Sequence, residues 1–244
     1  MKKFIKKAFN VSGYEIRRRV IDPKYEPRDS FLQQKALLGA VTDPLIFDVG
    51  ANVGEVTGEY RRLFPNAIIY AFEPFPESFR RLQTTFASDR RVHPHQLGFA
   101  ARAGTVPFNV NSDAVTNSLL MTDAVGSSFW GINILDTIQQ IEVEIVTVDA
   151  FCQTNDIKHI DILKIDTQGA ERLVLQGSGR MLFEKRISCV YTEILLVPTY
   201  QGQGKFHEIL GLLDSYSYKL FSMYNFQHRL GSNRLLQVDA IFTL

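Results

Sequence analysis

The residues of this chain best placed to do chemistry are a glycine-containing turn and an acid, each of which follows an apolar run. Residues 45–49 lead directly into Gly50-Ala51-Asn52-Val53-Gly54, and residues 68–72 are followed by Glu73, about twenty residues later. A buried strand, a tight turn that opens a helix, and a second strand ending in a carboxylate form the layout of a nucleotide-cofactor half-site. Glycine suits such a turn because a Cβ would hold the backbone away from the ligand. The Glu73 carboxylate can accept hydrogen bonds from both hydroxyls of a ribose.

The spacing of the glycines narrows the type of cofactor. The dinucleotide fingerprint is G-x-G-x-x-G, in which the middle glycine lets a pyrophosphate approach the backbone. In this chain Asn52 occupies that position, between Gly50 and Gly54. The turn therefore favours a ligand with one nucleoside and no diphosphate, and S-adenosylmethionine is the expected cofactor. A nicotinamide-dependent oxidoreductase is the alternative that this spacing argues against.

Three ordered motifs carry a resemblance to a known family. They are Asp48-Val-Gly-Ala-Asn-Val-Gly54 with Thr57, then Phe72-Glu73-Pro74, and then residues 162–171, which read Ile-Leu-Lys-Ile-Asp-Thr-Gln-Gly-Ala-Glu. In these motifs the chain resembles the FkbM-type methyltransferases, from about Leu45 to its C-terminus. That family transfers methyl groups from S-adenosylmethionine, typically to hydroxyls of sugars and natural products. The resemblance implies an O-methyltransferase that acts on a hydroxyl of a sugar, of a glycolipid or polysaccharide unit, or of a related small molecule.

The cofactor site implied by this resemblance follows the strand ends. Asp48 would orient the turn or accept from the methionine ammonium, and Thr57, at the helix start, would donate to the methionine carboxylate. Glu73 would bind the ribose, the backbone around Leu97 would contact the adenine, and Asp166 can hold the sulfonium end. The predicted cofactor-binding residues are Asp48, Gly50, Asn52, Gly54, Thr57, Glu73, Leu97 and Asp166.

Three acids are candidates for catalysis, because methyl transfer to a hydroxyl needs positioned reactants and the removal of one proton. Asp166 ends the strand predicted at 160–165, at the sheet edge where ligands of such folds bind. Glu193 ends the next strand, and Glu171 lies in a first helical turn, where a carboxylate also stabilises the helix dipole. Lys164 is expected to be a buried charge paired with a site carboxylate. A cofactor-binding module without turnover is the remaining alternative, which the presence of these acids disfavours.

No metal site is predicted. The family pattern often has an acid where this chain has Gln168, so a divalent ion held by three carboxylates is less favourable, although Asp166, Glu171 and Glu193 could still supply oxygen ligands. His93 and His95 alternate along one predicted strand, and such pairs are more often packed or solvated than bound to metal.

Apolar runs alternate with helical patterns from Leu45 onward, in the manner of βαβ units that feed a parallel sheet. The predicted fold class is a doubly wound, Rossmann-like α/β domain of the class I methyltransferase type, with a mostly parallel seven-stranded sheet. Residues 238–244 are expected as an antiparallel C-terminal edge strand. An inserted β-hairpin is expected at 104–110 and 141–148, with a lid between its strands. The other expected strands are 45–49, 67–72, 93–99, 160–165, 187–194 and 218–224, and the expected helices are the segment after the turn to 64, 76–87, 170–183 and 206–213.

Composition sets the broad class. The 244 residues, 45% of them hydrophobic, suffice for one α/β domain with a sizeable core, divided here into an appendage over 1–40 and a methyltransferase domain over 41–244. The formal net charge of +1 argues against nucleic acid as a partner and leaves a small molecule or glycan as the acceptor. Two cysteines and the lack of a secretory or spanning pattern predict a cytoplasmic protein.

The first nineteen residues are strongly basic and have a helical pattern. Apolar residues recur on one face and four lysines lie on the other, at positions 2, 3, 6 and 7. This predicts a short amphipathic helix that either contacts an anionic membrane surface peripherally or docks on the core or on a second subunit. Trp130, in the predicted lid, either stacks on the apolar face of a sugar ring or anchors the lid.

Overall fold

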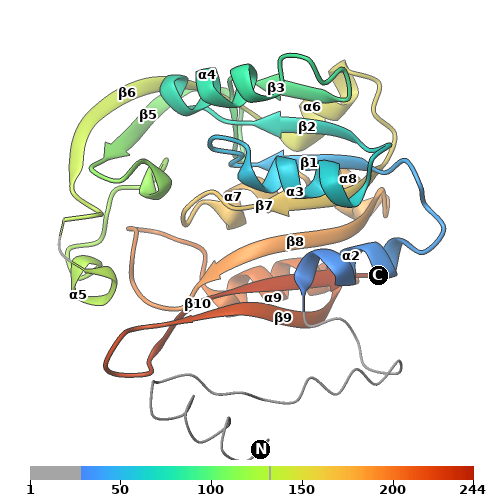
Figure 1. Cartoon of the computed structure of the whole chain (residues 1–244). Helices are drawn as coiled ribbons and strands as arrows, with labels where there is room; N and C mark the ends of the chain where they lie inside the picture. Colours follow the sequence, from blue (N-terminus) through green and yellow to red (C-terminus); the bar gives the residue numbers. More distant parts are fainter. Residues whose placement is uncertain (1–28, 132) are drawn as a thin grey trace, which may run out of the picture.

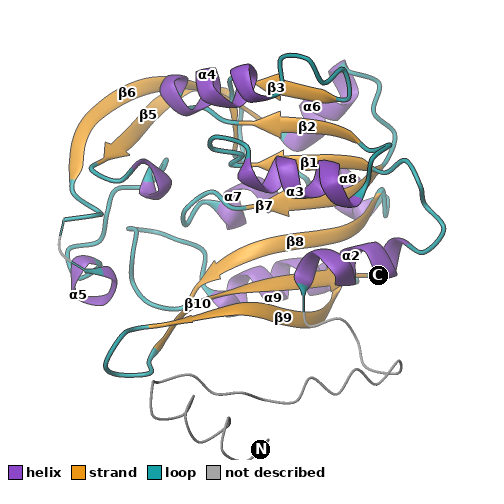
Figure 2. Cartoon of the chain, viewed as in Figure 1, coloured by secondary structure: helices purple, strands orange, loops and turns teal. Residues whose placement is uncertain are grey.

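The structure is a computed structural model that describes residues 29–131 and 133–244. A central sheet carries helices on both faces, and a smaller sheet stands at one end of it (Figures 1 and 2). Within the described ranges, no helix combines the length and the apolar character that crossing a membrane requires.

The central sheet confirms the predicted doubly wound α/β class. Its seven strands lie in the order β3-β2-β1-β7-β8-β10-β9; the pairs from β3 to β8 are parallel, and β10 is antiparallel to both of its neighbours. The strand order reverses between β1 and β7, and ligands of open α/β sheets bind at such a reversal. The strands are β1 Leu45–Val49, β2 Ile68–Phe72, β3 Val92–His95, β7 Ile160–Ile165, β8 Ile187–Leu195, β9 Lys219–His228 and β10 Leu235–Thr243.

Each face of the sheet buries its own core, because successive side chains of a strand point to opposite faces. Along β1, Phe47 and Val49 enter the core under α6 to α9, whereas Ile46 enters the core under α2 to α4. This double cover holds the strands in fixed register and brings their carboxyl ends to one edge. The helices are α2 Ser30–Leu38, α3 Glu55–Leu63, α4 Pro76–Thr85, α6 Val148–Thr154, α7 Glu171–Gln176, α8 Gly179–Phe183 and α9 Phe206–Ser215.

The expected edge position of residues 238–244 is wrong, although their antiparallel direction is confirmed. β10 lies between β8 and β9, and β9 forms the edge. Ala240, Ile241 and Phe242 are all fully buried, so β10 is covered on both faces, whereas the second half of β9 is exposed. An apolar run on both faces is typical of an internal strand.

Two other expected elements are divided in the structure. The strand expected at 93–99 ends at His95, and Gly98–Phe99 forms a separate strand, β4, in the smaller sheet. The helix expected at 170–183 is interrupted at Gly177, whose backbone lies so close to Ala100 that an added Cβ would be 2.2 Å from the Ala100 carbonyl oxygen. α6 was not expected from the sequence.

The predicted inserted hairpin is confirmed. β5 Gly104–Asn111 pairs antiparallel with β6 Thr137–Val146, and β4 joins β6 in parallel to complete a three-stranded sheet. Residues 112–131 and 133–136, called the lid below, connect the two hairpin strands and contain the short helical turns η1 Ala114–Thr116 and α5 Ser127–Trp130.

The C-terminal part of the predicted appendage packs on the domain. The Ser30 and Tyr191 hydroxyls lie 3.1 Å apart, and the Tyr60 hydroxyl donates a 2.8 Å hydrogen bond to Gln34, so α2 is joined to β8 and α3. The basic segment at 1–19 lies outside the described residues, and the division at residue 40 stays a prediction.

Candidate active site

A pocket of about 420 Å³ opens at the carboxyl ends of β1, β2, β7 and β8. One side, called the turn half, is lined by residues 50–53, residues 72–74, Gly98 and Phe99. A second set of lining residues, called the lid half, comprises lid residues together with Glu193, Thr199, Tyr200, Gln227 and Gln237. Asp166 and Gln168, which follow β7, also line the pocket. The hairpin connection therefore covers the pocket, as the lid prediction requires.

The turn half is shaped by backbone that only glycine tolerates. Gly50 has φ 76°, and a Cβ there would lie 1.8 Å from the backbone oxygen of Asp166. The Gly50 and Ala51 N–H groups both donate to the Phe72 carbonyl at 3.0 Å, which ties the turn to the end of β2. Gly54 does not line the pocket; its φ is 94°, and a Cβ would collide with Leu82 at 2.7 Å. Gly54 therefore serves the packing of α3 on α4.

Glu73 is held on the pocket wall by the turn. Its carboxylate accepts from the backbone N–H of Asn52 at 2.8 Å and of Phe75 at 2.9 Å, and the residue is 7% exposed. Burial raises the pKa of Glu73 to about 7, against the lowering effect of these two N–H groups. Each carboxylate oxygen can accept a second hydrogen bond, so Glu73 retains acceptor capacity toward the pocket.

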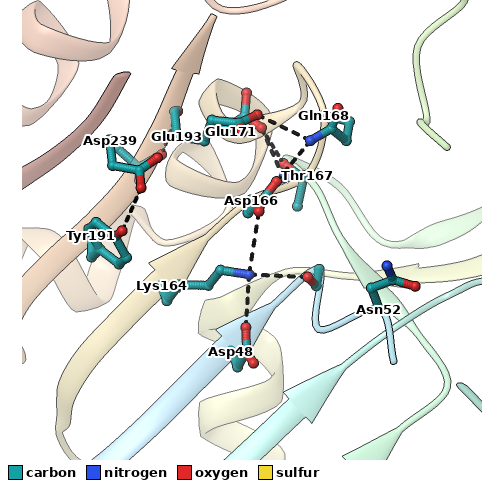
Figure 3. Close-up of polar contacts among 12 residues, drawn as sticks. Asp48, Asn52, Lys164, Asp166, Thr167, Gln168, Glu171, Tyr191, Glu193 and Asp239 are labelled. Carbon is teal, nitrogen blue, oxygen red and sulfur yellow. Dashed lines mark hydrogen bonds and ion pairs between the residues drawn. The ribbon is translucent and has the colours of Figure 1, made fainter. Parts of the chain in front are cut away.

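A buried ion pair supports the turn from below (Figure 3). The Lys164 ammonium lies 2.9 Å from Asp48 Oδ1 and donates to the Gly50 carbonyl at 3.1 Å, while the Thr57 hydroxyl donates to Asp48 Oδ2 at 2.6 Å. Burial acts to lower the pKa of Lys164, but the carboxylates of Asp48 and Asp166 outweigh it and raise that pKa above its ordinary value. Asp48 and Thr57 are fully buried and do not line the pocket. Their place indicates that they orient the turn.

Two carboxylates meet at the end of β7 and β8. The Gln168 amide nitrogen donates to Asp166 Oδ1 at 3.0 Å and to Glu193 Oε2 at 3.2 Å, so it bridges the two acids. Lys164 lies 3.8 Å from the other Asp166 oxygen (Figure 3). Burial, together with the carboxylates of Asp166 and Glu171, raises the pKa of Glu193 well above its ordinary value. Both acids line the pocket.

Besides Asp48, Gly54 and Thr57, two further predicted site residues lie off the pocket wall, Glu171 and Leu97. Glu171 is 1% exposed, and its Oε1 accepts from the backbone N–H of Thr167 at 2.9 Å and of Gly169 at 3.0 Å. Burial raises the pKa of Glu171 to about 7. Leu97 packs against the core, and Gly98 and Phe99 line the pocket in its place. Glu171 is placed to hold the loop that carries Asp166 and Gln168.

The lid half contains residues that the sequence did not single out. Tyr200 donates to the Thr116 carbonyl at 2.8 Å and thereby ties the loop after β8 to the lid. The Trp130 indole N–H donates to the Thr199 hydroxyl at 2.8 Å, which anchors the lid as one of the two readings of Trp130 requires. The sequence could have indicated Thr199 and Tyr200 by their position alone. Residues 196–204 follow β8, which ends at the same sheet edge as β1, β2 and β7.

The family of the chain follows from comparison with known sequences. Residues 48–220 match the model of the family described as the methyltransferase FkbM domain. The chain belongs to this family. The match spans the glycine turn, Glu73, Asp166 and Glu193, and so covers both halves of the pocket except its contacts from β9 and β10.

Named relatives of this FkbM-family chain are methyltransferases. It is 26% identical over 223 residues to the 2-O-methyltransferase NoeI of Sinorhizobium fredii, covering 88% of this chain and 90% of that protein. It is 26% identical to the hexuronic acid methyltransferase AglP of Haloferax volcanii, over 75% of this chain and 72% of that protein. Among solved structures, a precorrin-6y C5,15-methyltransferase from Geobacter metallireducens aligns with a TM-score of 0.47 and 14% identity, covering 94% and 93% of the two chains.

As an FkbM-family member, the protein is an S-adenosylmethionine-dependent methyltransferase. This decides against the oxidoreductase and against a binding module without turnover. The residues present fit the cofactor: the turn approaches the pocket without a side chain at Gly50, and Glu73 presents a fixed carboxylate beside it. When bound, S-adenosylmethionine supplies a methyl group on a positively charged sulfur.

Proposed function

We propose that the protein methylates a hydroxyl of a sugar, either free or within a glycolipid or polysaccharide unit, or of a related small molecule. The observation that carries this proposal is the pair of acids joined by Gln168 on the pocket wall, since a hydroxyl must lose a proton as it is methylated. The names of the relatives, one a 2-O-methyltransferase and one acting on hexuronic acid, support a sugar as acceptor.

The turn half would hold the cofactor. The backbone of residues 50–53 would contact the methionine part, Glu73 would accept from the ribose hydroxyls, and Gly98 with Phe99 would flank the adenine. Asp48 and Thr57 would act one layer below, by holding the turn in place.

Asp166 would act as the proton acceptor. The acceptor oxygen would gain the methyl group as the bond from that carbon to sulfur breaks, with the electron pair kept by sulfur as a neutral thioether. The same oxygen would lose its proton to the Asp166 carboxylate, so the product would be a neutral ether. Gln168 fixes the Asp166 side chain through a 3.0 Å hydrogen bond, and Lys164 places a positive charge 3.8 Å from its other oxygen. Glu193, on the same bridge, would position the acceptor, while Glu171 would position the loop.

The proposal is tested by incubating the purified protein with S-adenosylmethionine and a panel of mono- and oligosaccharides. We expect formation of S-adenosylhomocysteine together with a saccharide product heavier by one methylene and stable to base, as an ether is. Methylation confined to carboxylates, which gives a base-labile ester, or to amines would contradict the proposed function.

Glu73→Ala is expected to weaken S-adenosylhomocysteine binding by roughly ten-fold or more. Hydrogen bonds to a charged acceptor contribute about 1.5–3 kcal/mol, and Glu73 is the carboxylate on the wall of the turn half. Calorimetry measures the change. Glu77→Ala is the matched control, because Glu77 lies in the first turn of α4 and does not line the pocket. This variant should bind S-adenosylhomocysteine like the parent. Equal affinity of the Glu73 variant and the parent would end the ribose assignment.

Cofactor affinity is expected to fall as the pH drops below about 7. The raised pKa of Glu73 means that its carboxylate is ionised above about pH 7 and protonated below it. Protonation removes the charge and one acceptor site, so S-adenosylhomocysteine binds more weakly on the acid side. Titrating the dissociation constant against pH checks this. Glu73→Gln should bind more weakly and show a flat profile; a slope shared by both proteins would assign it to another group.

The basic N-terminal segment suggests where in the cell the protein acts. We propose a cytoplasmic enzyme in which residues 1–19 contact an anionic membrane surface, where lipid-linked glycans are built. Deleting residues 1–19 should abolish sedimentation with anionic vesicles while S-adenosylhomocysteine binding is retained. Retained sedimentation of the shortened protein would contradict the membrane contact. If light scattering shows a dimer for the full chain and a monomer for the shortened one, the segment would be assigned to self-association instead.

A further inference from the structure

Where the lid half meets Asp166, the described lining residues carry acidic charge and no free cation. Asp113, Asp166 and Glu193 contribute carboxyl groups there, and Lys164 is the only lysine or arginine among the described residues that line the pocket. Arg234, on the connection between β9 and β10, lies over the Phe129 ring at 4.9 Å from its centroid and does not line the pocket.

The Lys164 ammonium is already paired with other groups of the protein. It is 3% exposed, and its ammonium contacts the Gly50 carbonyl at 3.1 Å, Asp48 at 2.9 Å and Asp166 at 3.8 Å. Its charge is paired with two carboxylates, and its burial keeps the ammonium away from an incoming ligand. Among the described residues that line the pocket, no positive group therefore remains to pair with an anionic acceptor.

A further carboxylate lies behind the acidic wall. Asp239 on β10 is the register partner of Glu193 and accepts from the Tyr191 hydroxyl at 2.5 Å (Figure 3). It also accepts from the Asn225 amide at 2.7 Å. Whichever protonation state Glu193 adopts, it brings no positive charge toward an incoming carboxylate. The charge that the described residues place at this end of the pocket is therefore negative or neutral.

Neutral hydrogen-bonding groups supply the recognition instead. Gln227 and Gln237 line the lid half with amides that both donate and accept. Asn117 is 9% exposed and its Oδ1 accepts from the Asn111 N–H at 2.8 Å, while its Nδ2 has no hydrogen-bond partner within the described structure. Asn117 also lines the pocket, but its Nδ2 is buried, so the amides open to an incoming hydroxyl are those of Gln227 and Gln237.

We propose that the acceptor unit bound in the lid half is an uncharged sugar and that the pocket discriminates against uronic acids. This inference rests on the proposed function and names its substrate class. A carboxylate on the sugar would meet Asp166 and Glu193 without a counter-charge from the described lining residues, whereas hydroxyls match the amides of Gln227 and Gln237. The chain thereby differs in expected acceptor from its relative named for hexuronic acid.

The test uses matched oligosaccharides that differ only in one functional group. A uronic-acid oligosaccharide set is compared with the same set after its carboxyl groups have been reduced to primary alcohols. We expect kcat/KM for ether formation to be higher on the reduced set by roughly ten-fold or more, because an unpaired like charge in an interface is strongly unfavourable. Equal or faster methylation of the uronic acids would overturn the inference and leave the proposed function standing. Absence of ether formation on every sugar would overturn both.

A variant that adds a positive charge to the pocket wall tests the same inference without relying on the choice of one sugar. Gln237→Arg places a guanidinium, which pairs well with carboxylates, on the wall of the lid half, and Gln237→Met removes the amide without adding charge. We expect the arginine variant to shift the ratio of kcat/KM values toward uronic acids by roughly ten-fold. The methionine variant loses a hydrogen bond but adds no charge, so it should lower kcat/KM on both substrate sets and shift the ratio far less than the arginine variant does. An unchanged ratio in the arginine variant would contradict charge as the basis of discrimination.

Discussion

Replacing Asp166 with asparagine is expected to lower kcat by a factor on the order of 10²–10⁴, the usual contribution of a positioned general base. Asparagine keeps the size of the side chain and can still accept the 3.0 Å hydrogen bond from Gln168, but it cannot take up the proton of a hydroxyl. Affinity for S-adenosylhomocysteine should stay close to that of the parent. Single-turnover kinetics and calorimetry measure the two quantities separately.

Asp113→Asn is the matched control for this variant. Asp113 also lines the pocket, but its carboxylate accepts from the Val115 N–H at the start of η1, away from the Gln168 bridge. It should retain most of the parent rate. Near-normal methyl transfer by the Asp166 variant would move the proton-accepting role to Glu193. Loss of cofactor binding would instead make Asp166 a binding residue.

The sequence predicted those features that depend on local pattern. The order of strand, glycine turn, helix and strand from residue 45 to Glu73 is reproduced, because buried parallel strands are short apolar runs and the turn needs the positive φ of Gly50. The positions at which β7 and β8 end could also be predicted from the sequence. These strand ends place Asp166 and Glu193 on the wall of one pocket.

Features that depend on tertiary contact could not be predicted. Gly177 follows α7 at a point where the backbone of Ala100 leaves no room for a Cβ, and these positions are far apart in sequence. The role of Gln168 as a bridge depends on where β7 and β8 end relative to each other. Tyr200 contacts the lid at Thr116, 84 positions away in the sequence. A hydrophobic period describes neighbouring residues and cannot indicate a contact over such a separation. Periodicity therefore locates the strand ends, whereas the lid half of the pocket requires the folded chain.

The ion pair beneath the turn leads to the second large effect. Lys164→Met is expected to reduce the free energy of unfolding by about 3–5 kcal/mol, the usual cost of leaving one buried charge without its partner. Asp48 is fully buried, and the variant would leave its Oδ1 without the ammonium at 2.9 Å and the Gly50 carbonyl without a donor at 3.1 Å. Urea denaturation followed by circular dichroism measures the loss.

A double variant separates the charge effect from the loss of packing. Asp48→Asn removes the unpaired charge while its side-chain oxygen can still accept from the Thr57 hydroxyl at 2.6 Å. Combining it with Lys164→Met should therefore recover a large part of the lost stability, so that the double variant is more stable than Lys164→Met alone. If the two losses simply add, the pair contributes no coupling energy. The turn would then be held by its backbone bonds to Phe72 rather than by the charges below it.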